Sequence, residues 1–79
     1  MHTCHMSNQQ IASRIAYAAR STQRARQSYW AAVAEGNDRR AALAARGLAV
    51  AERGLIAATG SPTKARAAEI AHIESLHSH

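Results

Sequence analysis

The sequence is short of the residues from which most small proteins build a core. Phenylalanine is absent, proline and cysteine occur once each, and leucine, isoleucine and valine together number only 11. A single cysteine excludes an intramolecular disulfide. No apolar run reaches the length of a membrane span or of a signal-peptide core. We therefore expect a chain without membrane segments that works in a cytoplasm, either that of a bacterium or that of a cell infected by a phage.

What the chain has instead is alanine, which supplies 20 of its 79 residues. That length corresponds to one domain, close to the size at which a single core becomes insufficient. Few large apolar residues and a net charge of +5 would suggest disorder. Alanine, however, is the strongest helix former, and the apolar residues recur at helical spacing. We predict an all-α protein that buries too little surface alone and therefore forms a homodimer or a larger oligomer.

Two long helices joined by a tight turn are predicted. The first runs from about Asn8, with Ser7 or Asn8 as its N-cap, to Glu35; Gly36 begins the turn, and the second helix runs from about Asp38 to the Thr59-Gly60 pair. A loop this short favours an antiparallel hairpin. The first helix carries one apolar stripe made of Ile11, Ile15, Ala18, Thr22, Ala25, Tyr29 and Val33.

A short third helix is predicted to begin at Ser61 and Pro62, with the serine as N-cap and the proline in the first helical position. Ile70, Ile73 and Leu76 give this helix a narrow apolar face, and Glu69 can pair with Arg66 one turn earlier. The chain then divides into a flexible leader (1–7), the helical hairpin (8–60) and a short C-terminal helix with a frayed tail (61–79).

Small residues form a column along the second helix, and two of them are glycines, each of which costs about 1 kcal/mol relative to alanine. A helix accepts this when another backbone packs very close to it. The alternative is that both glycines are tolerated accidents or mark local kinks. On the first interpretation, the second helix is the oligomer interface, and the predicted packing residues are Ala44, Gly47, Leu48, Ala51, Gly54, Leu55 and Ala58.

Basic and aromatic residues share the face of the first helix that points away from its apolar stripe. No acidic residue occurs before Glu35, so this face would attract an acidic partner. An exposed tyrosine among arginines could anchor a protein interface or stack on a base, although a single surface tyrosine is also ordinary. Trp30, beside Tyr29, packs in the core or a dimer, or else is an exposed anchor. The predicted partner-binding residues are Arg14, Tyr17, Arg20, Arg24 and Trp30.

A second basic feature is a row of three arginines, Arg39, Arg46 and Arg53, spaced seven residues apart along the second helix. Such a row is about 21 Å long at about 1.5 Å per residue. It matches the phosphates of a nucleic acid or an acidic protein surface. The ordinary interpretation is a solvated helix face.

No catalytic or cofactor-binding pattern is present. The carboxylates are scattered, no glycine-rich phosphate loop follows a strand, and Cys4 has no positioned base. Histidines and the cysteine gather near both ends of the chain, but their spacing matches no zinc pattern. We therefore expect neither enzyme activity nor a bound metal. The residues weighed for the metal site are His2, Cys4, His5, His72, His77 and His79.

Together these features predict a small non-catalytic interaction protein that self-associates and binds another macromolecule. The first candidate for that partner is a protein with an acidic surface. Regulators, antitoxins and inhibitors encoded by phages or mobile elements are often of this kind. The alternative is a basic helical oligomer that binds nucleic acid or nucleotides. A helix-turn-helix reader is disfavoured because the second helix offers few side chains that read bases.

Overall fold

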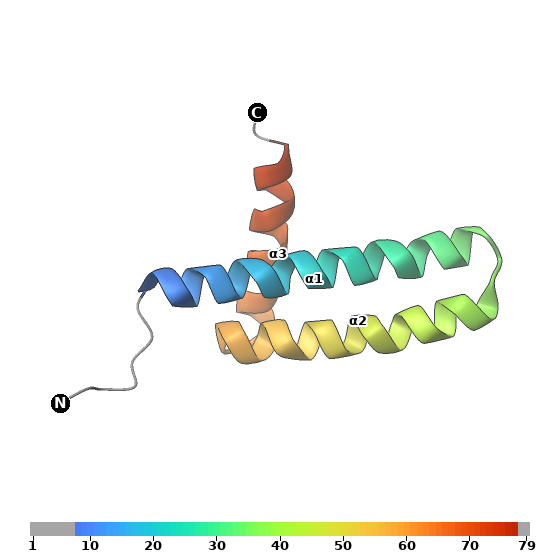
Figure 1. Ribbon diagram of the computed structural model, residues 1–79, viewed down its shortest axis with the longest axis horizontal. Coiled ribbons are helices and arrows are strands. Elements are labelled where there is room, and N and C mark those ends of the chain that lie inside the picture. The colour runs from blue at the N-terminus through green and yellow to red at the C-terminus, as the bar shows by residue number, and fades with distance from the viewer. Residues whose placement is uncertain (1–7, 78–79) are drawn as a thin grey trace.

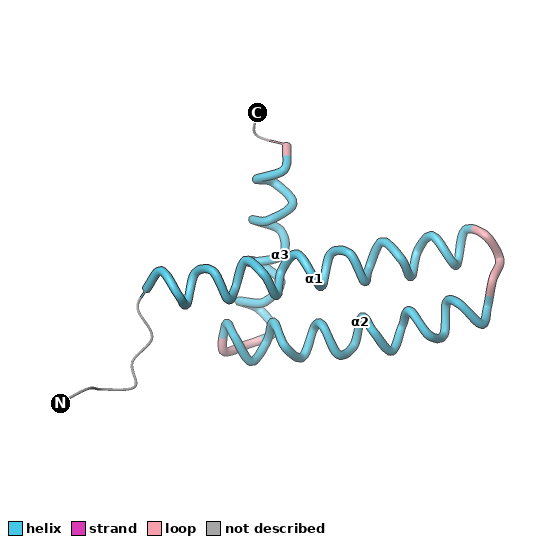
Figure 2. Tube along the Cα trace, in the orientation of Figure 1, coloured by secondary structure: helices cyan, strands magenta, loops and turns pink. Residues whose placement is uncertain are grey.

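The chain folds into three α-helices, and no strand occurs within residues 8–77, the part that the computed structural model describes. Helix α1 (Asn8–Ala34) and helix α2 (Asp38–Thr59) run antiparallel side by side, and α3 (Pro62–Leu76) crosses them (Figures 1 and 2). The predicted all-α hairpin with a short third helix is therefore confirmed. The leader, and Ser7 as a cap of the first helix, lie outside the described residues.

The hairpin turn is built from local hydrogen bonds that the sequence anticipates. Gly36 has a φ of +72°, the left-handed conformation that glycine adopts without strain. Its N–H donates to the Val33 carbonyl, and the Asn37 N–H donates to the Ala32 carbonyl, each at 3.0 Å. The Asn37 side chain then accepts from the Arg40 N–H as the N-cap of α2. One helix thus ends and the next begins within three residues.

The start of α3 follows the same logic. Gly60, with a φ of +101°, ends α2 and donates its N–H to the Ile56 carbonyl at 2.7 Å. The Ser61 side chain accepts from the Lys64 N–H, and Pro62 occupies the first helical turn, as predicted. This tight connection turns the chain sharply, so that α3 leaves the hairpin instead of extending α2 (Figure 1).

Small side chains let α1 and α2 lie close together. Thr22 is fully buried in α1, and its hydroxyl donates to the Ala18 carbonyl at 2.8 Å while lying 3.2 Å from the Ala51 carbonyl of α2. A side chain as short as threonine reaches the neighbouring backbone only when the two helices approach closely. The alanines at the seam permit that approach.

The core where α3 meets the hairpin is built mainly from alanine. Ala19, Leu55 and Ala65 form the buried cluster, and four further apolar residues pack against it, namely Ile15, Ala18, Ile56 and Ala68. Leu55 and Thr22 are the largest fully buried side chains among the described residues. Each large apolar side chain contributes about 1.5–3 kcal/mol when buried, so the described helices bury few strong contributors.

Two parts of the predicted apolar pattern are wrong. Ile11 and Val33, at the ends of the predicted stripe on α1, are exposed, and near the turn the fully buried residue of α1 is Ala32 instead. On α3 the expected face also differs, since Ile70 and Leu76 are exposed while Ala65 and Glu69 are buried. Figure 1 shows that the C-terminal half of α3 projects beyond the hairpin, and of the three predicted residues only Ile73 is half-buried.

No helix within residues 8–77 is long and apolar enough to cross a membrane.

Candidate interaction surfaces

The predicted basic and aromatic residues of α1 lie on its outer surface. Arg14, Tyr17, Arg20 and Arg24 are all exposed, and Tyr17 keeps 65% of its surface accessible. The Arg20 guanidinium lies over the Tyr17 ring, 5.7 Å from its centroid, within the range of a cation–π interaction. We call these four residues the tyrosine–arginine face. Their exposure means that none of them is needed for the core.

Trp30 does not belong to this face. It lies thirteen residues beyond Tyr17, about 20 Å further along the helix at about 1.5 Å per residue. Trp30 is 59% exposed, so it does not pack in the core of the chain. Tyr29 is half-buried and meets the Trp30 ring edge-on, with 5.1 Å between centroids. The tryptophan is therefore a separate exposed feature near the hairpin turn.

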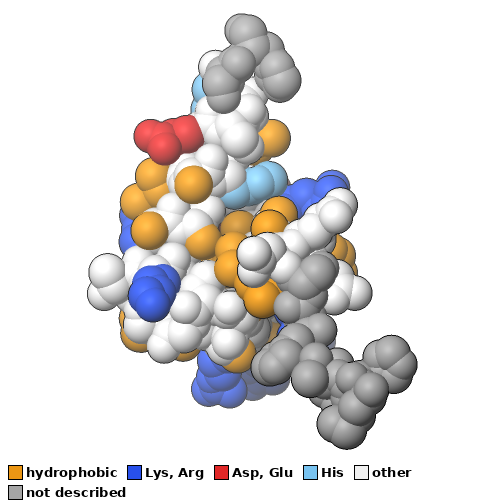
Figure 3. All heavy atoms as spheres, turned by 90° about the vertical axis from the view of Figure 1, so that its left-hand side faces the viewer, with side chains coloured by type: hydrophobic (Ala, Val, Ile, Leu, Met, Phe, Trp, Pro, Cys, Tyr) orange, Lys and Arg blue, Asp and Glu red, His pale blue; other side chains and the backbone are white. Residues whose placement is uncertain are grey.

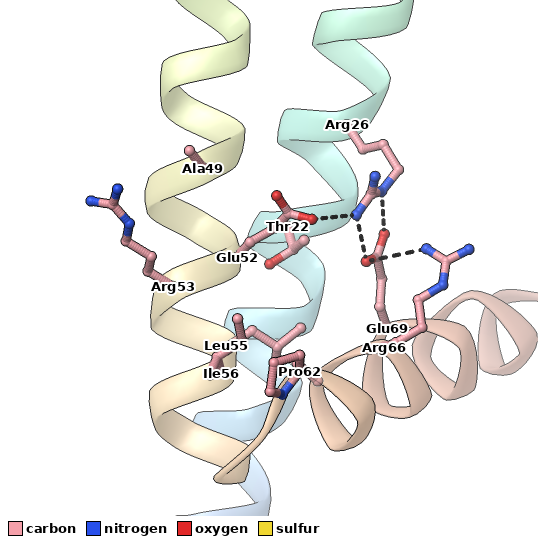
Figure 4. Close-up of a pocket in the computed structure, with 11 residues that line it drawn as sticks. Thr22, Arg26, Ala49, Glu52, Arg53, Leu55, Ile56, Pro62, Arg66 and Glu69 are labelled. Atoms are coloured by element: carbon pink, nitrogen blue, oxygen red, sulfur yellow. Dashed lines mark hydrogen bonds and ion pairs between the residues drawn. The ribbon is translucent and has the colours of Figure 1, made fainter.

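The basic row of α2 is also separate from the tyrosine–arginine face. Arg39, Arg46 and Arg53 are exposed, and their spacing puts them on the side of α2 opposite to Leu55, which faces α1. The close-up in Figure 4 shows Arg53 pointing away from α1. The two arginine sets thus lie on opposite edges of the hairpin and cannot contact one flat partner together.

Glu35, Glu52 and Glu69 find their ion-pair partners outside the basic row. Glu35 pairs with Arg40 near the turn, while Glu52 and Glu69 both pair with Arg26. None of the ion pairs found among residues 8–77 involves the basic row. In the space-filling view of Figure 3, acidic side chains are seen only in the upper part of the molecule, whereas basic ones lie around its sides and bottom. The hairpin surface is therefore positively charged on both edges.

The predicted packing residues of α2 divide into two groups. Leu55 is buried, and Ala44, Leu48, Ala51 and Ala58 are half-buried. Gly47 and Gly54 are exposed, and a Cβ atom added to either would meet no heavy atom within 4 Å. The glycines are therefore not required for the packing of α1 on α2. They instead leave a shallow surface beside Leu43 and Val50, which are 59% and 66% exposed.

A groove runs between α1 and α2 at the end of the hairpin far from the turn. It has a volume of about 500 Å³ and is lined by Arg14, Tyr17, Ala18, Ser21, Ala51, Gly54, Ala57 and Ala58. No residue of α3 lines it. We call it the base groove. Thr22 marks the side of α1 that faces α2. Arg14 and Ser21, which line the groove, lie about 80–100° from Thr22 around the helix axis, and the α3 contacts Ala19 and Arg26 lie on the other side of Thr22. The groove and α3 therefore occupy opposite sides of the α1–α2 seam.

The side of the seam that α3 covers holds the strongest electrostatic contact. Arg26 donates from Nε and Nη2 to the two carboxylate oxygens of Glu69, at 2.8 and 3.0 Å, and from Nη2 to Glu52 at 3.0 Å. Figure 4 shows Arg26 of α1 aimed at Glu69 of α3. Glu69 is almost completely buried, and Arg66 lies 3.9 Å from it as a weaker second partner. A paired fork of this kind fixes both distance and orientation.

The hydrogen bond to Glu69 raises the pKa of Arg26 above its ordinary value, with burial opposing and Glu52 reinforcing the effect. A group whose pKa is higher in the folded state stabilises the fold fully below its unfolded pKa and loses that contribution only as the pH rises through the folded value. For an arginine this window lies far above neutral pH. The Arg26 side of the pair therefore remains charged under ordinary conditions.

The spacing along α3 pairs Glu69 only with Arg66 and misses Arg26 as its partner. The predicted pair of Glu69 with Arg66 is present, yet Arg26 is the closer partner. One signal was available: Glu69 follows Ala65 by four residues, so that the two side chains share one face of α3. An acidic residue on the buried face of a helix indicates that the neighbouring helix provides a cationic partner for it.

Most of the metal candidates cannot be located. His2, Cys4, His5 and His79 lie outside the described residues. Of the two that are described, His72 is half-buried beside α1 and His77 is exposed beyond the end of α3. Within residues 8–77 no group of three or more histidine, cysteine, aspartate or glutamate side chains could hold a metal ion.

No protein-family model, no curated protein and no solved structure matches this chain.

Proposed function

We propose that this chain is a non-catalytic helical interaction protein that binds an acidic surface of another protein through its tyrosine–arginine face. The observation that carries the proposal is the exposed Tyr17 held beneath Arg20, on a helix that contains no acidic residue. Tyrosine and arginine are the residue types that anchor protein interfaces most often. Their contact orders both side chains before binding, which reduces the entropy lost on association.

Nucleic acid is the second candidate partner, and the basic row supports it. Arg39, Arg46 and Arg53 are exposed at regular spacing on the outer side of α2. Phosphate contacts require positive charge and tolerate such simple geometry. The row contains no aromatic residue, however, and base-reading side chains are scarce beside it. We therefore rank this partner below an acidic protein.

Self-association is a further part of the proposal. The exposed residues Leu43, Gly47 and Val50, which we call the tip stripe, form a smooth apolar strip on the half of α2 nearest the turn. The small number of large buried side chains in the described helices favours additional burial between copies. A two-fold homodimer is the simplest assembly that would provide it.

The cellular role that fits this proposal is that of a regulator, or of an inhibitor encoded by a phage or mobile element that acts on a protein of its host. A cytoplasmic location follows from that role. This part of the proposal rests on the small size, the basic charge and the helical architecture, and on the analogy with small helical regulators.

Affinity capture with matched variants tests the proposal. The full chain is immobilised and exposed to a bacterial lysate with and without nuclease treatment, in parallel with the variant Arg20→Gln/Arg24→Gln and the control Arg39→Gln/Arg46→Gln. We expect the wild type and the control to capture the same acidic proteins, and the α1 variant to lose them. Capture that disappears after nuclease treatment, or that depends on Arg39 and Arg46 instead, would contradict the proposal and favour nucleic acid.

A further inference from the structure

The base groove is an open site on a hairpin whose opposite side is already occupied by a helix. Its floor consists of small residues, and a Cβ atom added to Gly54 would meet nothing within 4 Å. A ligand backbone can therefore come close to α2 at this point. The only aromatic lining residue is Tyr17, whose exposed ring stands beside Arg14 on the α1 side.

Helix α3 shows what this hairpin accepts in such a position. It places Ala65 against Ala19 and Leu55, with Ala68 packed alongside. It then directs one carboxylate, that of Glu69, onto Arg26 of α1. On that side of the hairpin α3, which is joined to α2 through Gly60 and Ser61, thus combines small apolar residues that face the seam with an acid that faces an α1 arginine.

The base groove offers the same combination of features. Alanines and Gly54 provide the floor, and Arg14 provides an α1 cation, as Arg26 does on the other side. Among residues 8–77 no carboxylate lines the groove, and α1 carries no acidic residue along its whole length. Charge complementarity therefore favours an acidic ligand. It disfavours a second copy of this chain, whose net charge is +5.

We propose that the base groove binds one amphipathic, acidic α-helix of a partner protein. The inference rests on the proposed function and specifies its ligand. Alanine or leucine side chains of the partner helix lie on Ala51, Gly54 and Ala58, and its glutamates meet Arg14 beside Tyr17. The mode is that of a helix laid in a groove, in which residues three and four apart provide the anchors.

A designed peptide provides the probe. It has 18 residues, capped ends and a fluorescent label, with alanine and leucine on one helical face and glutamate on both flanks. A second peptide has the same composition in an order that disperses the apolar residues. Fluorescence anisotropy is measured on the full chain. We expect the amphipathic peptide to bind at least about tenfold more tightly than the scrambled one, a difference of about 1.4 kcal/mol.

Two glycine variants locate the binding site. Gly54→Leu fills the groove floor without a clash in the free chain, and we expect it to weaken peptide binding by about tenfold or more. Gly47→Leu makes the same change outside the groove and should leave peptide binding unaltered. Circular dichroism checks that both variants remain helical. Arg14→Gln should weaken binding about threefold and reduce its dependence on salt.

Four results would overturn the inference. Equal binding of both peptides would show recognition by charge alone, which would leave the proposed function standing. Unchanged binding by Gly54→Leu would place the peptide elsewhere. Conversion of a dimer to a monomer by Gly54→Leu in light scattering would identify a second copy as the occupant. If a random single-stranded oligonucleotide displaces the peptide, and Gly54→Leu weakens the binding of that oligonucleotide as well, the two results together would identify a nucleic acid as the occupant of the groove.

If neither peptide binds, the groove inference is also overturned. The proposed function is then decided separately, by whether acidic proteins are captured in a manner that depends on Arg20 and Arg24.

Discussion

At the scale of single residues, the pair of Arg26 and Glu69 determines how α3 sits on the hairpin. The alanines around the pair make few orienting contacts, and each contributes only a modest free energy of burial because it removes little apolar surface from water. The charged fork supplies the orientation that alanine packing lacks. Because Glu69 is buried, removing its partner would leave a carboxylate in a poorly hydrated site, which is far more damaging than losing an exposed ion pair.

Breaking this pair should therefore destabilise the fold and release α3. We expect Arg26→Ala to reduce the free energy of unfolding by about 3 kcal/mol, because it leaves the buried Glu69 carboxylate with only its weaker partner Arg66. Arg26→Leu/Glu69→Leu should recover most of that loss, since no charge is then buried. Chemical denaturation followed by circular dichroism measures both.

The exposed pair of Arg40 and Glu35 provides the control for this prediction. Both of its side chains are 53% exposed, so Arg40→Ala should cost less than about 1 kcal/mol. If Arg26→Ala is no more damaging than Arg40→Ala, the Arg26–Glu69 pair does not hold α3 in place.

At the scale of the helices, the sequence predicts the boundaries well because local chemistry decides them. Gly36, Asn37, Ser61 and Pro62 each satisfy or remove backbone groups at a helix end, and the roles expected of Gly36, Ser61 and Pro62 are confirmed. The buried face of α3 could not be obtained in this way. It depends on the direction in which α3 leaves the hairpin, and that direction is set by contacts with residues far away in the sequence, above all by Arg26.

The same distinction applies to the candidate surfaces. Helical spacing alone predicts that Tyr17 and its arginines share a face and that the basic row forms a line. It does not reveal that the two sets lie on opposite edges of the hairpin, or that a groove opens beside Gly54. Both facts depend on how α1 and α2 are rotated against each other, which the broad apolar arc of α2 leaves undetermined.

The glycines of α2 lead to a prediction at this scale. Gly47 has helical backbone geometry and open space around it, so Gly47→Ala should stabilise the isolated chain by up to about 1 kcal/mol. Gly47→Leu should also preserve helicity, yet it should abolish self-association by forcing copies apart at the tip stripe. Light scattering over a range of concentrations, with circular dichroism on the same samples, measures both effects.

Gly54→Leu is the matched control, because it lies in the base groove and should leave assembly intact. A Gly47→Leu variant that remains oligomeric would refute the role given to the tip stripe.

At the scale of the whole molecule, the fold separates its charges. Ion pairs engage Glu35, Glu52 and Glu69 within the structure, and the arginines of both hairpin edges face outward. The molecule is thus a thin basic hairpin, held on one side by its own α3 and open on the other. This arrangement supports binding of an acidic partner. We ascribe that binding to the ordered contact between Tyr17 and Arg20 in addition to the positive charge.

The most direct test of this claim measures whether the chain binds DNA tightly through its charge alone. Labelled random-sequence DNA, single-stranded and duplex, is titrated with the full chain and with Tyr17→Ala at physiological salt, and anisotropy is recorded. We expect only weak binding, with a Kd no tighter than about 1 µM, as is usual for non-specific phosphate contacts. Submicromolar binding that Tyr17→Ala leaves unchanged would contradict it, because the arginines would then be serving a nucleic acid without any contribution from the tyrosine.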